Sequence, residues 1–382
     1  MRYKLGEIFE VGSGGTPSKN HPEYYGGSIP WIKTGDLKCE YLYGAEDYIT
    51  EEGVNNSSAK MYAPDTVLIA MYGATIGATS ILKIDACTNQ ACAAFKKSEK
   101  VIPEYLYYFF KSQKERFVKD GVGGAQPNIS AGYLKNVEME VPTLERQTEI
   151  VDILDKVNRI IEQRETELEE LDNLIKSRFV EMFGTLENPV QEFDRATLKE
   201  LCDKITDGKH GGCAQEEGSE RYFVGAREIY DDEVHYDTAP EINVDEFEKD
   251  YKRCNIEIGD FLIVNTGATI GKSAIATDLR TEHTLLQKSV ALLKVKRELL
   301  NPVFLKWCYR VNTKMYMVES ASAQPNLLLS KINATEIYVP DIRLQNHFAS
   351  FVEQVTKLKF EVQKSLDETQ TLMDSLMQQY FG

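Results

Sequence analysis

An internal repeat constrains the fold of this chain more than any other feature. Gly73-Ala74-Thr75-Ile76-Gly77 returns as Gly267-Ala268-Thr269-Ile270-Gly271, 194 residues later, and Ala125-Gln126-Pro127-Asn128 returns as Ala323-Gln324-Pro325-Asn326, 198 residues later. Two motifs in the same order at almost one spacing indicate a tandem duplication. Further matches near the same offset are Leu5 with Leu198, Gln90 with Gln287, Val141-Pro142 with Val339-Pro340, Gln147 with Gln345, and Phe183-Gly184 with Phe381-Gly382. A period near 195 residues predicts two similar domains and not a solenoid.

The halves diverge between these matches. Residues 31–36, Trp-Ile-Lys-Thr-Gly-Asp, stand opposite residues 223–228, Phe-Val-Gly-Ala-Arg-Glu, which share a strand-then-loop pattern but few identities. A shared scaffold with different surfaces is expected of two domains that do the same kind of work on different targets.

Each half ends in a segment with the pattern of a long helix. Residues 145–183 contain neither proline nor glycine, and apolar side chains follow an alternating spacing of four and three residues, with the same design after Pro340. That spacing is typical of a coiled coil, although two ordinary core helices remain an alternative. The predicted seam is Leu154, Val157, Ile161, Leu168, Leu171, Ile175 and Met182 in the first helix, and Phe348, Phe351, Val355, Leu358, Val362, Leu372 and Leu376 in the second.

Connectivity predicts how these helices pair. The first helix leaves domain one and enters domain two, and the second leaves domain two, so paired seams run antiparallel. The predicted fold is α/β (α+β): two tandem domains separated by a long antiparallel two-helix coiled coil, a pseudo-two-fold internal repeat. Within the domains, 66–71 and 260–265 are predicted strands, and 105–118 and 303–317 are predicted helices that begin near a proline.

Composition restricts the function less than the repeat does. The formal net charge is −16, which by itself argues against a partner rich in phosphate. Residues 145–187 carry a net charge of −6 and residues 228–260 carry −9, so the remainder is almost neutral and local basic faces are possible. No segment has the length of a membrane span and the N-terminus lacks a signal peptide, so the expected compartment is the cytoplasm.

The motifs that resemble catalytic sites are incomplete. The segment 267–273 has one residue too few for a phosphate-binding loop, and Ala78 replaces its lysine in the first half. Asn301-Pro302-Val303-Phe304 lacks the second proline of an amino-methyltransferase loop. The seven cysteines and five histidines are scattered, with no zinc-ligand spacing. We therefore expect no catalytic residue, no cofactor site and no metal site in this chain.

Polar and basic side chains accompany the repeat in both halves. They are candidates for contact with nucleic acid, whereas the alternative for any single lysine is ordinary solvated surface charge. The candidates are Lys33, Lys38, Lys60, Gln90, Lys96, Lys97, Arg116, Lys119, Lys209, His210, Arg227, Lys272, Gln287, Lys288, Arg310 and Lys314.

Taken together, these motifs resemble a known family. Residues 29–37, Ile-Pro-Trp-Ile-Lys-Thr-Gly-Asp-Leu, with Gly-Ala-Thr-Ile-Gly, Gln-Pro-Asn, Val-Pro and a long helix in each half, resemble the DNA-specificity subunit of type I restriction-modification systems over essentially the whole chain. The resemblance implies target-recognition domains at 1–143 and 185–341, and spacer helices at 144–184 and 342–382. Lys209-His210 stands where the first half has Gly15-Thr16-Pro17, which leaves the role of that loop open.

The resemblance also implies partners. Each domain would read one half of a bipartite double-stranded DNA target, and the helices would dock two methylation subunits, with restriction subunits in the full complex. The S-adenosylmethionine, ATP and magnesium would bind to those subunits and not to this chain. The alternatives are a stand-alone methyl-transfer or nucleotide-dependent enzyme, and a scaffold with two modules that do not bind DNA.

Overall fold

The computed structural model of the chain describes residues 1–121, 128–316 and 326–382. It divides into two compact units. Unit 1 comprises residues 1–165 and 364–382, and unit 2 comprises residues 166–363. The division falls within the two long helices, so each unit contains a part of both and ends at different residues from the predicted domains.

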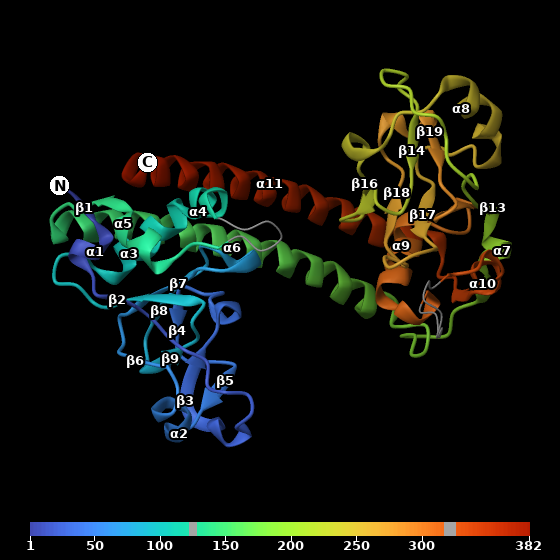
Figure 1. Cartoon of the computed structure of the whole chain (residues 1–382). Helices are drawn as coiled ribbons and strands as arrows, with labels where there is room; N and C mark the ends of the chain where they lie inside the picture. The colour runs from blue at the N-terminus through green and yellow to red at the C-terminus, as the bar shows by residue number, and fades with distance from the viewer. Residues whose placement is uncertain (122–127, 317–325) are drawn as a thin grey trace. The chain divides into compact units, whose positions relative to one another are not determined.

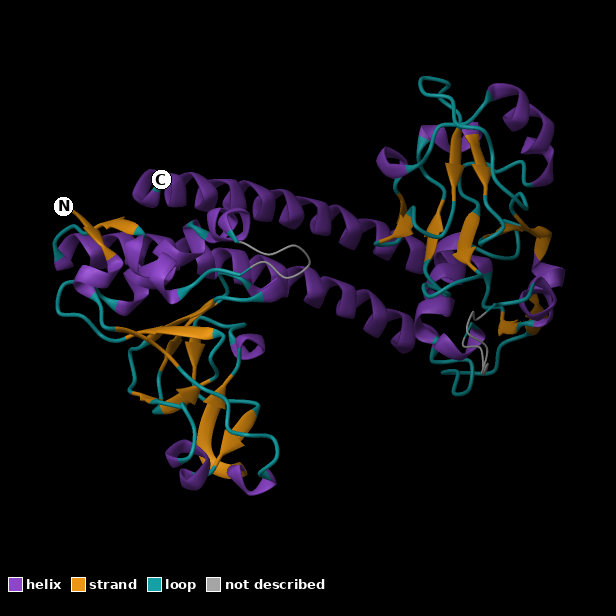
Figure 2. Cartoon of the chain, viewed as in Figure 1, coloured by secondary structure: helices purple, strands orange, loops and turns teal. Residues whose placement is uncertain are grey.

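Unit 1 contains two main sheets beside the long helices (Figures 1 and 2). One sheet has the order β2-β10-β7-β8-β4, the other has the order β5-β3-β9-β6, and β1 pairs with β11. The strands are β1 Arg2–Lys4, β2 Val11–Ser13, β3 Tyr25–Ile32, β4 Tyr41–Leu42, β5 Asp47–Ile49, β6 Met61–Tyr62, β7 Val67–Ala70, β8 Thr79–Leu82, β9 Ala86–Thr88, β10 Cys92–Phe95 and β11 Glu138–Glu140. The helices are α1 Leu5–Ile8, α2 Glu51–Asn55, α3 Pro103–Ser112, α4 Lys114–Asp120 and α5 Ala131–Asn136, with 3₁₀ turns η1 Pro22–Tyr24, η2 Thr34–Asp36 and η3 Gly73–Thr75.

Unit 2 repeats this plan. Its sheet β13-β20-β17-β18 matches β2-β10-β7-β8, the parallel pair β14-β19 matches β3-β9, and β12-β21 matches β1-β11. The strands are β12 Arg195–Thr197, β13 Cys202–Asp207, β14 Tyr222–Val224, β15 Ile229–Tyr230, β16 Glu233–Val234, β17 Phe261–Val264, β18 Ser273–Ile275, β19 Thr284–Leu286, β20 Val290–Val295 and β21 Glu336–Tyr338. The helices are α7 Leu198–Leu201, α8 Val244–Asp250, α9 Pro302–Val311 and α10 Leu329–Ala334, with η4 Tyr236–Thr238, η5 Tyr251–Arg253, η6 Leu279–His283 and η7 Thr313–Met315. The predicted duplication is confirmed.

The two predicted strands are confirmed as β7 and β17, each shorter than expected. The predicted helices start at Pro103 and Pro302, as expected, but the first is interrupted and the second ends early. The first breaks at Gln113 before α4, and the second ends at Asn312, whose side-chain amide donates to the Cys308 carbonyl oxygen at 2.8 Å. Residue 317, the predicted end of the second helix, lies outside the described residues.

The two long helices are α6, Leu144–Phe183, and α11, Ile342–Phe381, each of 40 residues. Within unit 1, Arg146 near the start of α6 lies 5.9 Å from the ring of Tyr380 near the end of α11. Within unit 2, the Phe179 and Phe348 rings are 5.3 Å apart, so the end of α6 meets the start of α11. The helices therefore pair antiparallel inside each unit, as the sequence predicts.

The predicted seam is correct for most of its length and wrong at two positions. The seam residues of α6 are all buried or half-buried, but Leu358 and Leu372 of α11 are 56% and 49% exposed. Counted from Phe348, the predicted seam follows at intervals of three and then four residues. The buried and half-buried positions of α11 instead follow at intervals of four and then three. That phase places Lys359, which pairs with Asp172 at 2.7 Å, and Met373 where leucines were expected. One residue along a helix turns the side chain by about 100°, enough to move it from seam to solvent.

Sequence reasoning also missed two aromatic residues of α6. Phe179 and Phe183 are fully buried and pack on Phe304 of α9 and on Phe348. They belong to the hydrophobic core of unit 2 itself, so here the long helix forms part of the core and is more than a spacer.

Candidate nucleic-acid interface

The site begins at the parallel strand pair that both units share. Ile32 of β3 stands opposite Thr88 of β9, and Val224 of β14 stands opposite Leu286 of β19. Parallel strands end at the same edge, so the turns that follow both strands lie together there.

The turn after β3 and the turn after β14 are built in the same way. A carboxylate accepts the backbone N–H three residues before it: Asp36 Oδ2 accepts from Lys33 at 2.7 Å, and Glu228 Oε2 accepts from Gly225 at 2.8 Å. Both carboxylates are almost fully buried. Each turn therefore keeps its backbone shape while the residues between stay free to vary.

A second loop crosses the end of each pair. The Gly15 N–H donates to the Thr88 carbonyl oxygen at 2.9 Å, and the Lys209 N–H donates to the Leu286 carbonyl oxygen at 2.7 Å. Lys209 thus occupies the position of Gly15. The preceding residue is glycine in both halves because a Cβ at Gly14 would stand 1.8 Å from the Thr88 oxygen, and one at Gly208 would stand 2.1 Å from the Leu286 oxygen.

The Gly-Ala-Thr-Ile-Gly motifs complete the arrangement. They form the tight turns β7–β8 and β17–β18, as predicted, and all four motif glycines have positive φ. Just before them, the Met71 N–H donates to the Ala91 carbonyl oxygen at 2.8 Å, and the Asn265 N–H donates to the Ser289 carbonyl oxygen at 2.9 Å. Residues 125–127 and 323–325 of the Gln-Pro-Asn motifs lie outside the described residues, but Asn128 and Asn326 bridge to the same turns.

Backbone hydrogen bonds connect these four loops in each unit, and we call the set the loop rim. The rim of unit 1 comprises residues 14–16, 33–36, 71–78 and 89–91, and the rim of unit 2 comprises residues 208–210, 225–228, 265–272 and 287–289. Backbone hydrogen bonds at equivalent positions hold both rims, whereas their side chains differ.

The rims contain half of the predicted contact residues. Those on a rim are Lys33, Gln90, Lys209, His210, Arg227, Lys272, Gln287 and Lys288. Those elsewhere are Lys38, Lys60, Lys96, Lys97, Arg116, Lys119, Arg310 and Lys314. Several of the latter form ion pairs on the surface, such as Lys38 with Glu46 at 3.0 Å and Lys96 with Glu10 at 2.6 Å. Exposed pairs of this kind contribute little to stability, so they stay candidates for contact.

One predicted match is wrong. Gln90 and Gln287 were matched at an offset of 197, but the Asn89 N–H donates to the Ile32 carbonyl oxygen at 2.9 Å and the Gln287 N–H donates to that of Val224 at 2.8 Å. Gln287 is therefore the counterpart of Asn89, and Gln90 is the counterpart of Lys288. The sequence could not show this shift because no identity lies close enough to fix the register.

A cavity of about 520 Å³ opens beside the rim of unit 2. Lys272 of the rim and Lys176 of α6 line it together with Arg310 of α9. Arg310 is held by Asp232 at 2.9 Å and lies over the Trp307 ring at 4.8 Å. Arg310, one of the predicted contact residues, is therefore part of the packing of unit 2, and Asp232 partly neutralises its charge.

The acidic stretch 228–260 is neutralised to a large extent within unit 2. Six of its twelve carboxylates form ion pairs, and most of the cations lie outside the stretch: Asp232 pairs with Lys306 and Arg310, Asp237 with Arg280, Glu246 and Asp250 with Lys209, and Glu257 and Asp260 with Lys294. Its formal charge of −9 therefore overstates the negative field near the rim.

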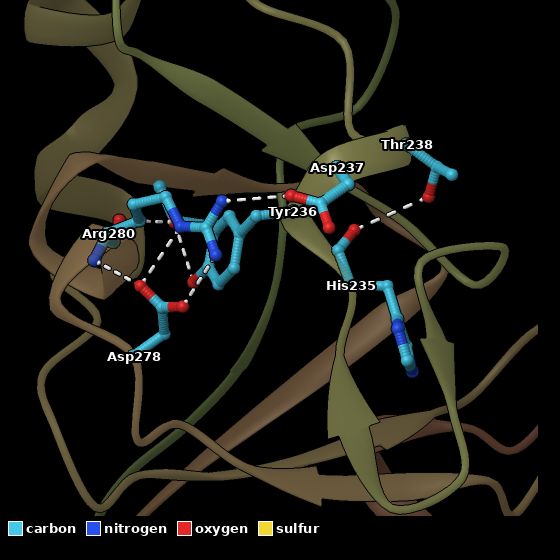
Figure 3. Close-up of polar contacts among 7 residues, drawn as sticks. His235, Tyr236, Asp237, Thr238, Asp278 and Arg280 are labelled. Carbon is cyan, nitrogen blue, oxygen red and sulfur yellow. Dashed lines mark hydrogen bonds and ion pairs between the residues drawn. The ribbon is translucent and has the colours of Figure 1, made fainter. Parts of the chain in front are cut away.

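The Arg280 cluster shows how this pairing supports the site (Figure 3). The Arg280 guanidinium donates to Asp278 at 2.7 Å, lowers the pKa of that carboxyl below its ordinary value, and lies 4.7 Å from the Tyr236 ring. The Arg280 carbonyl oxygen accepts from the Thr284 hydroxyl at 2.8 Å. Since Thr284 is the first residue of β19, the cluster fixes the strand whose other end carries the rim.

The close approach at the rim yields a direct prediction. Gly14→Ala and Gly208→Ala should each displace the rim backbone and lower the stability of their own unit by about 1–3 kcal/mol, as for other substitutions that overpack a site. Gly35→Ala is the matched control, because a Cβ there meets nothing within 4 Å among the described residues. Urea denaturation of the three variants tests this, and equal midpoints for Gly14→Ala and Gly35→Ala would contradict it.

The described residues hold no group of three or more histidine, cysteine, aspartate or glutamate side chains placed to bind a metal ion. Across the same ranges, no helix combines the length and apolar character needed to cross a bilayer.

Comparison with known proteins gives one consistent family. A family model described as the type I restriction modification DNA specificity domain matches residues 1–173 and 191–369. The chain is 35% identical over 185 residues to the type I restriction enzyme MjaIX specificity subunit of Methanocaldococcus jannaschii, covering 47% of this chain and 43% of the relative. It is 33% identical over 162 residues to the EcoR124I/EcoR124II specificity subunit of Escherichia coli, covering 41% and 40%. These alignments span less than half the length of either relative.

Solved structures share the fold. A type I restriction-modification S subunit from M. genitalium superimposes with a TM-score of 0.56 at 16% identity, covering 100% of this chain and 96% of that one. A chain from a study of complex assembly and conformational transition of the type I R-M system gives a TM-score of 0.65 at 15% identity, covering 100% and 97%.

Proposed function

Because the chain belongs to the family of type I restriction modification DNA specificity domains, we propose that it selects the DNA target of a type I restriction-modification complex. Each unit reads one half of a bipartite double-stranded site through its loop rim. The single observation that carries this proposal is the pair of rims, with equivalent backbone hydrogen bonds and different side chains. Such an arrangement keeps the same binding geometry and changes the sequence that is read.

The rim side chains suit the two kinds of contact that DNA recognition needs. Cations such as Lys272 and Lys288 bind phosphates and set the register on the duplex. Amide side chains such as Gln90 and Gln287 can donate and accept at once, which matches the N6 and N7 edge of adenine. In the free protein, Gln90 Oε1 accepts from the Thr16 hydroxyl, which orients the amide.

The long helices offer surface for protein partners. In unit 2, Leu358 and Phe360 of α11 are 56% and 68% exposed, and in unit 1 Ile160 of α6 is also exposed. Each of these side chains contributes apolar area that a bound subunit would remove from water. These helices dock two methylation subunits, and restriction subunits join the full complex.

No chemistry is assigned to this chain. Methyl transfer from S-adenosylmethionine, and cleavage that depends on ATP and magnesium, take place on the partner subunits. The complex works in the cytoplasm, where it meets DNA. The family of specificity domains and the absence of a complete cofactor motif in the sequence support this assignment.

A domain exchange tests the function. Residues 1–143 are replaced by the first domain of another family member, and both proteins select duplexes from a randomised pool, with and without methylation subunits. We expect one half-site to change and the other to stay the same. A change in both half-sites would contradict the proposal that each unit reads one half-site. Failure of both proteins to retain DNA would favour a scaffold that does not bind DNA.

A further inference from the structure

The two rims differ in charge at structurally equivalent positions. Gly35 and Arg227 are the third residues of the equivalent turns after β3 and β14. Ala78 and Lys272 end the Gly-Ala-Thr-Ile-Gly turns, and their carbonyl oxygens accept from Ala70 and Val264 in the same way, both at 2.8 Å. At each of these positions unit 2 has a cation and unit 1 has a small neutral residue.

The third position is the turn that follows β9 or β19, where unit 1 has Gln90 and unit 2 has Lys288. All three cations of unit 2 are exposed. Among the described residues, no carboxylate lies within 4.0 Å of the charged group of any of the three, so none must be displaced before Arg227, Lys272 or Lys288 can bind a phosphate.

The other rim cations are already paired. Lys33 of unit 1 forms an ion pair with Asp47, and Asp47 raises the pKa of the Lys33 amine. Lys209 of unit 2 lies between Glu246 and Asp250, at 3.1 and 2.7 Å. Each rim thus has one paired lysine, and the difference in free positive charge comes from the three equivalent positions.

We infer that the two units bind their half-sites by unequal means: the rim of unit 2 supplies most of the phosphate contacts through Arg227, Lys272 and Lys288, and the rim of unit 1 relies on uncharged contacts. This inference rests on the proposed DNA binding. Neutralising a phosphate releases counterions, so log K falls with log[salt] with a slope of about −0.9 for each contact. The half-site read by unit 2 therefore carries most of the salt dependence.

The first test removes the charge from unit 2. The full chain with R227Q/K272Q/K288Q is titrated with a random-sequence duplex at several salt concentrations, since phosphate binding does not depend on sequence. We expect the slope to become shallower by about 2–3. K199Q/R297Q/R343Q is the matched control: it removes three exposed cations of unit 2 that lie outside the rim and should leave the slope unchanged. Fluorescence of Trp307, buried in unit 2, verifies folding.

The second test adds the charge to unit 1. G35R/A78K/Q90K places cations at the three equivalent positions, and Gly35 has open space for a side chain among the described residues. We expect the slope to become steeper by about 2–3. Lys114 is exposed and packs on Gly77 of the unit 1 rim, so K114Q removes the cation that lies against that rim and should leave the slope unchanged.

The outcomes separate the inference from the proposed function. If the wild-type chain binds DNA but the unit 2 variant and its control have equal slopes, or K114Q makes the slope shallower by about 0.9, the inference is wrong and DNA binding stands. If the wild-type chain binds no duplex at any salt concentration, with or without methylation subunits, the proposed function fails. A steeper slope for the unit 1 variant together with a shallower slope for the unit 2 variant supports the inference.

Discussion

Replacing Gln147 by alanine should lower the free energy of unfolding of unit 1 by about 3–5 kcal/mol. Gln147 is fully buried at the start of α6. Its Oε1 accepts from the Ile102 N–H at 3.0 Å, and its Nε2 donates to the carbonyl oxygens of Lys100 and Pro142 at 2.8 and 3.0 Å. Alanine leaves these three backbone groups without a partner, and each such group costs about 1–3 kcal/mol.

Unit 2 contains the same arrangement of hydrogen bonds around Gln345, the counterpart of Gln147. Gln345 accepts from the Asn301 N–H at 2.9 Å and donates to the carbonyl oxygens of Leu299 and Pro340 at 3.0 and 2.8 Å. Both glutamines therefore join the start of a long helix to the segment that leads into α3 or α9. Gln345→Ala should destabilise unit 2 as Gln147→Ala destabilises unit 1.

The measurement uses the two tryptophans of the chain, since Trp31 lies in the core of unit 1 and Trp307 in the core of unit 2. Urea unfolding followed by Trp31 in a W307F background reports on unit 1. Gln163→Ala, at an exposed position of α6 in the same unit, is the control and should change stability by less than about 0.5 kcal/mol. Equal midpoints for Gln147→Ala and Gln163→Ala would show that the buried amide is dispensable.

Phe348→Ala should destabilise unit 2 by about 3–5 kcal/mol, the usual cost of deleting a buried aromatic ring. Phe348 is fully buried, with ring centroids 5.3 Å from Phe179, 5.7 Å from Phe183 and 6.4 Å from Trp307. The cavity would lie where α6, α9 and α11 meet, and Trp307 fluorescence in a W31F background follows the transition.

The control for Phe348 is another phenylalanine of the same helix. Phe360 is 68% exposed, so Phe360→Ala should change the free energy of unfolding by less than about 0.5 kcal/mol. If both variants unfold at the same urea concentration, the buried contacts of Phe348 between α6 and α11 do not contribute to the stability of unit 2.

The sequence predicts the architecture well because the two halves share identical residues in the same order. Gly-Ala-Thr-Ile-Gly forms turns and Val-Pro precedes the long helices. The backbone conformation at these positions restricts the residue type, so the same residues occur in both halves. The phase of α11 is harder to predict. At residues 358 and 359 the apolar residue, Leu358, is the exposed one, and at residues 372 and 373 both Leu372 and Met373 are apolar. The choice depends on the partner helix, where Asp172 is placed to pair with Lys359.

The loop rims could not be predicted from the sequence. They are held by backbone bonds between distant segments, such as the Gly15 N–H to the Thr88 carbonyl oxygen, and backbone groups carry no residue signature. Basic residues could be found by type, but the sequence does not show that Lys33 and Lys209 are paired whereas Arg227 and Lys288 are exposed. Whether a basic side chain forms an ion pair depends on the fold. It distinguishes the basic residues that are free to bind a phosphate from those that a carboxylate already holds.

The division of the chain into units has a consequence for the order of folding during synthesis. Unit 2 is one continuous segment, 166–363, so all of its core residues have left the ribosome before residue 364 follows. Unit 1 needs residues 364–382, since Met373 is buried in its core and the Phe381 ring lies 5.1 Å from that of Tyr105. The part of the chain made first therefore completes its core last, because the apolar face of α3 and the first half of α6 stay uncovered until residues 364–382 leave the ribosome.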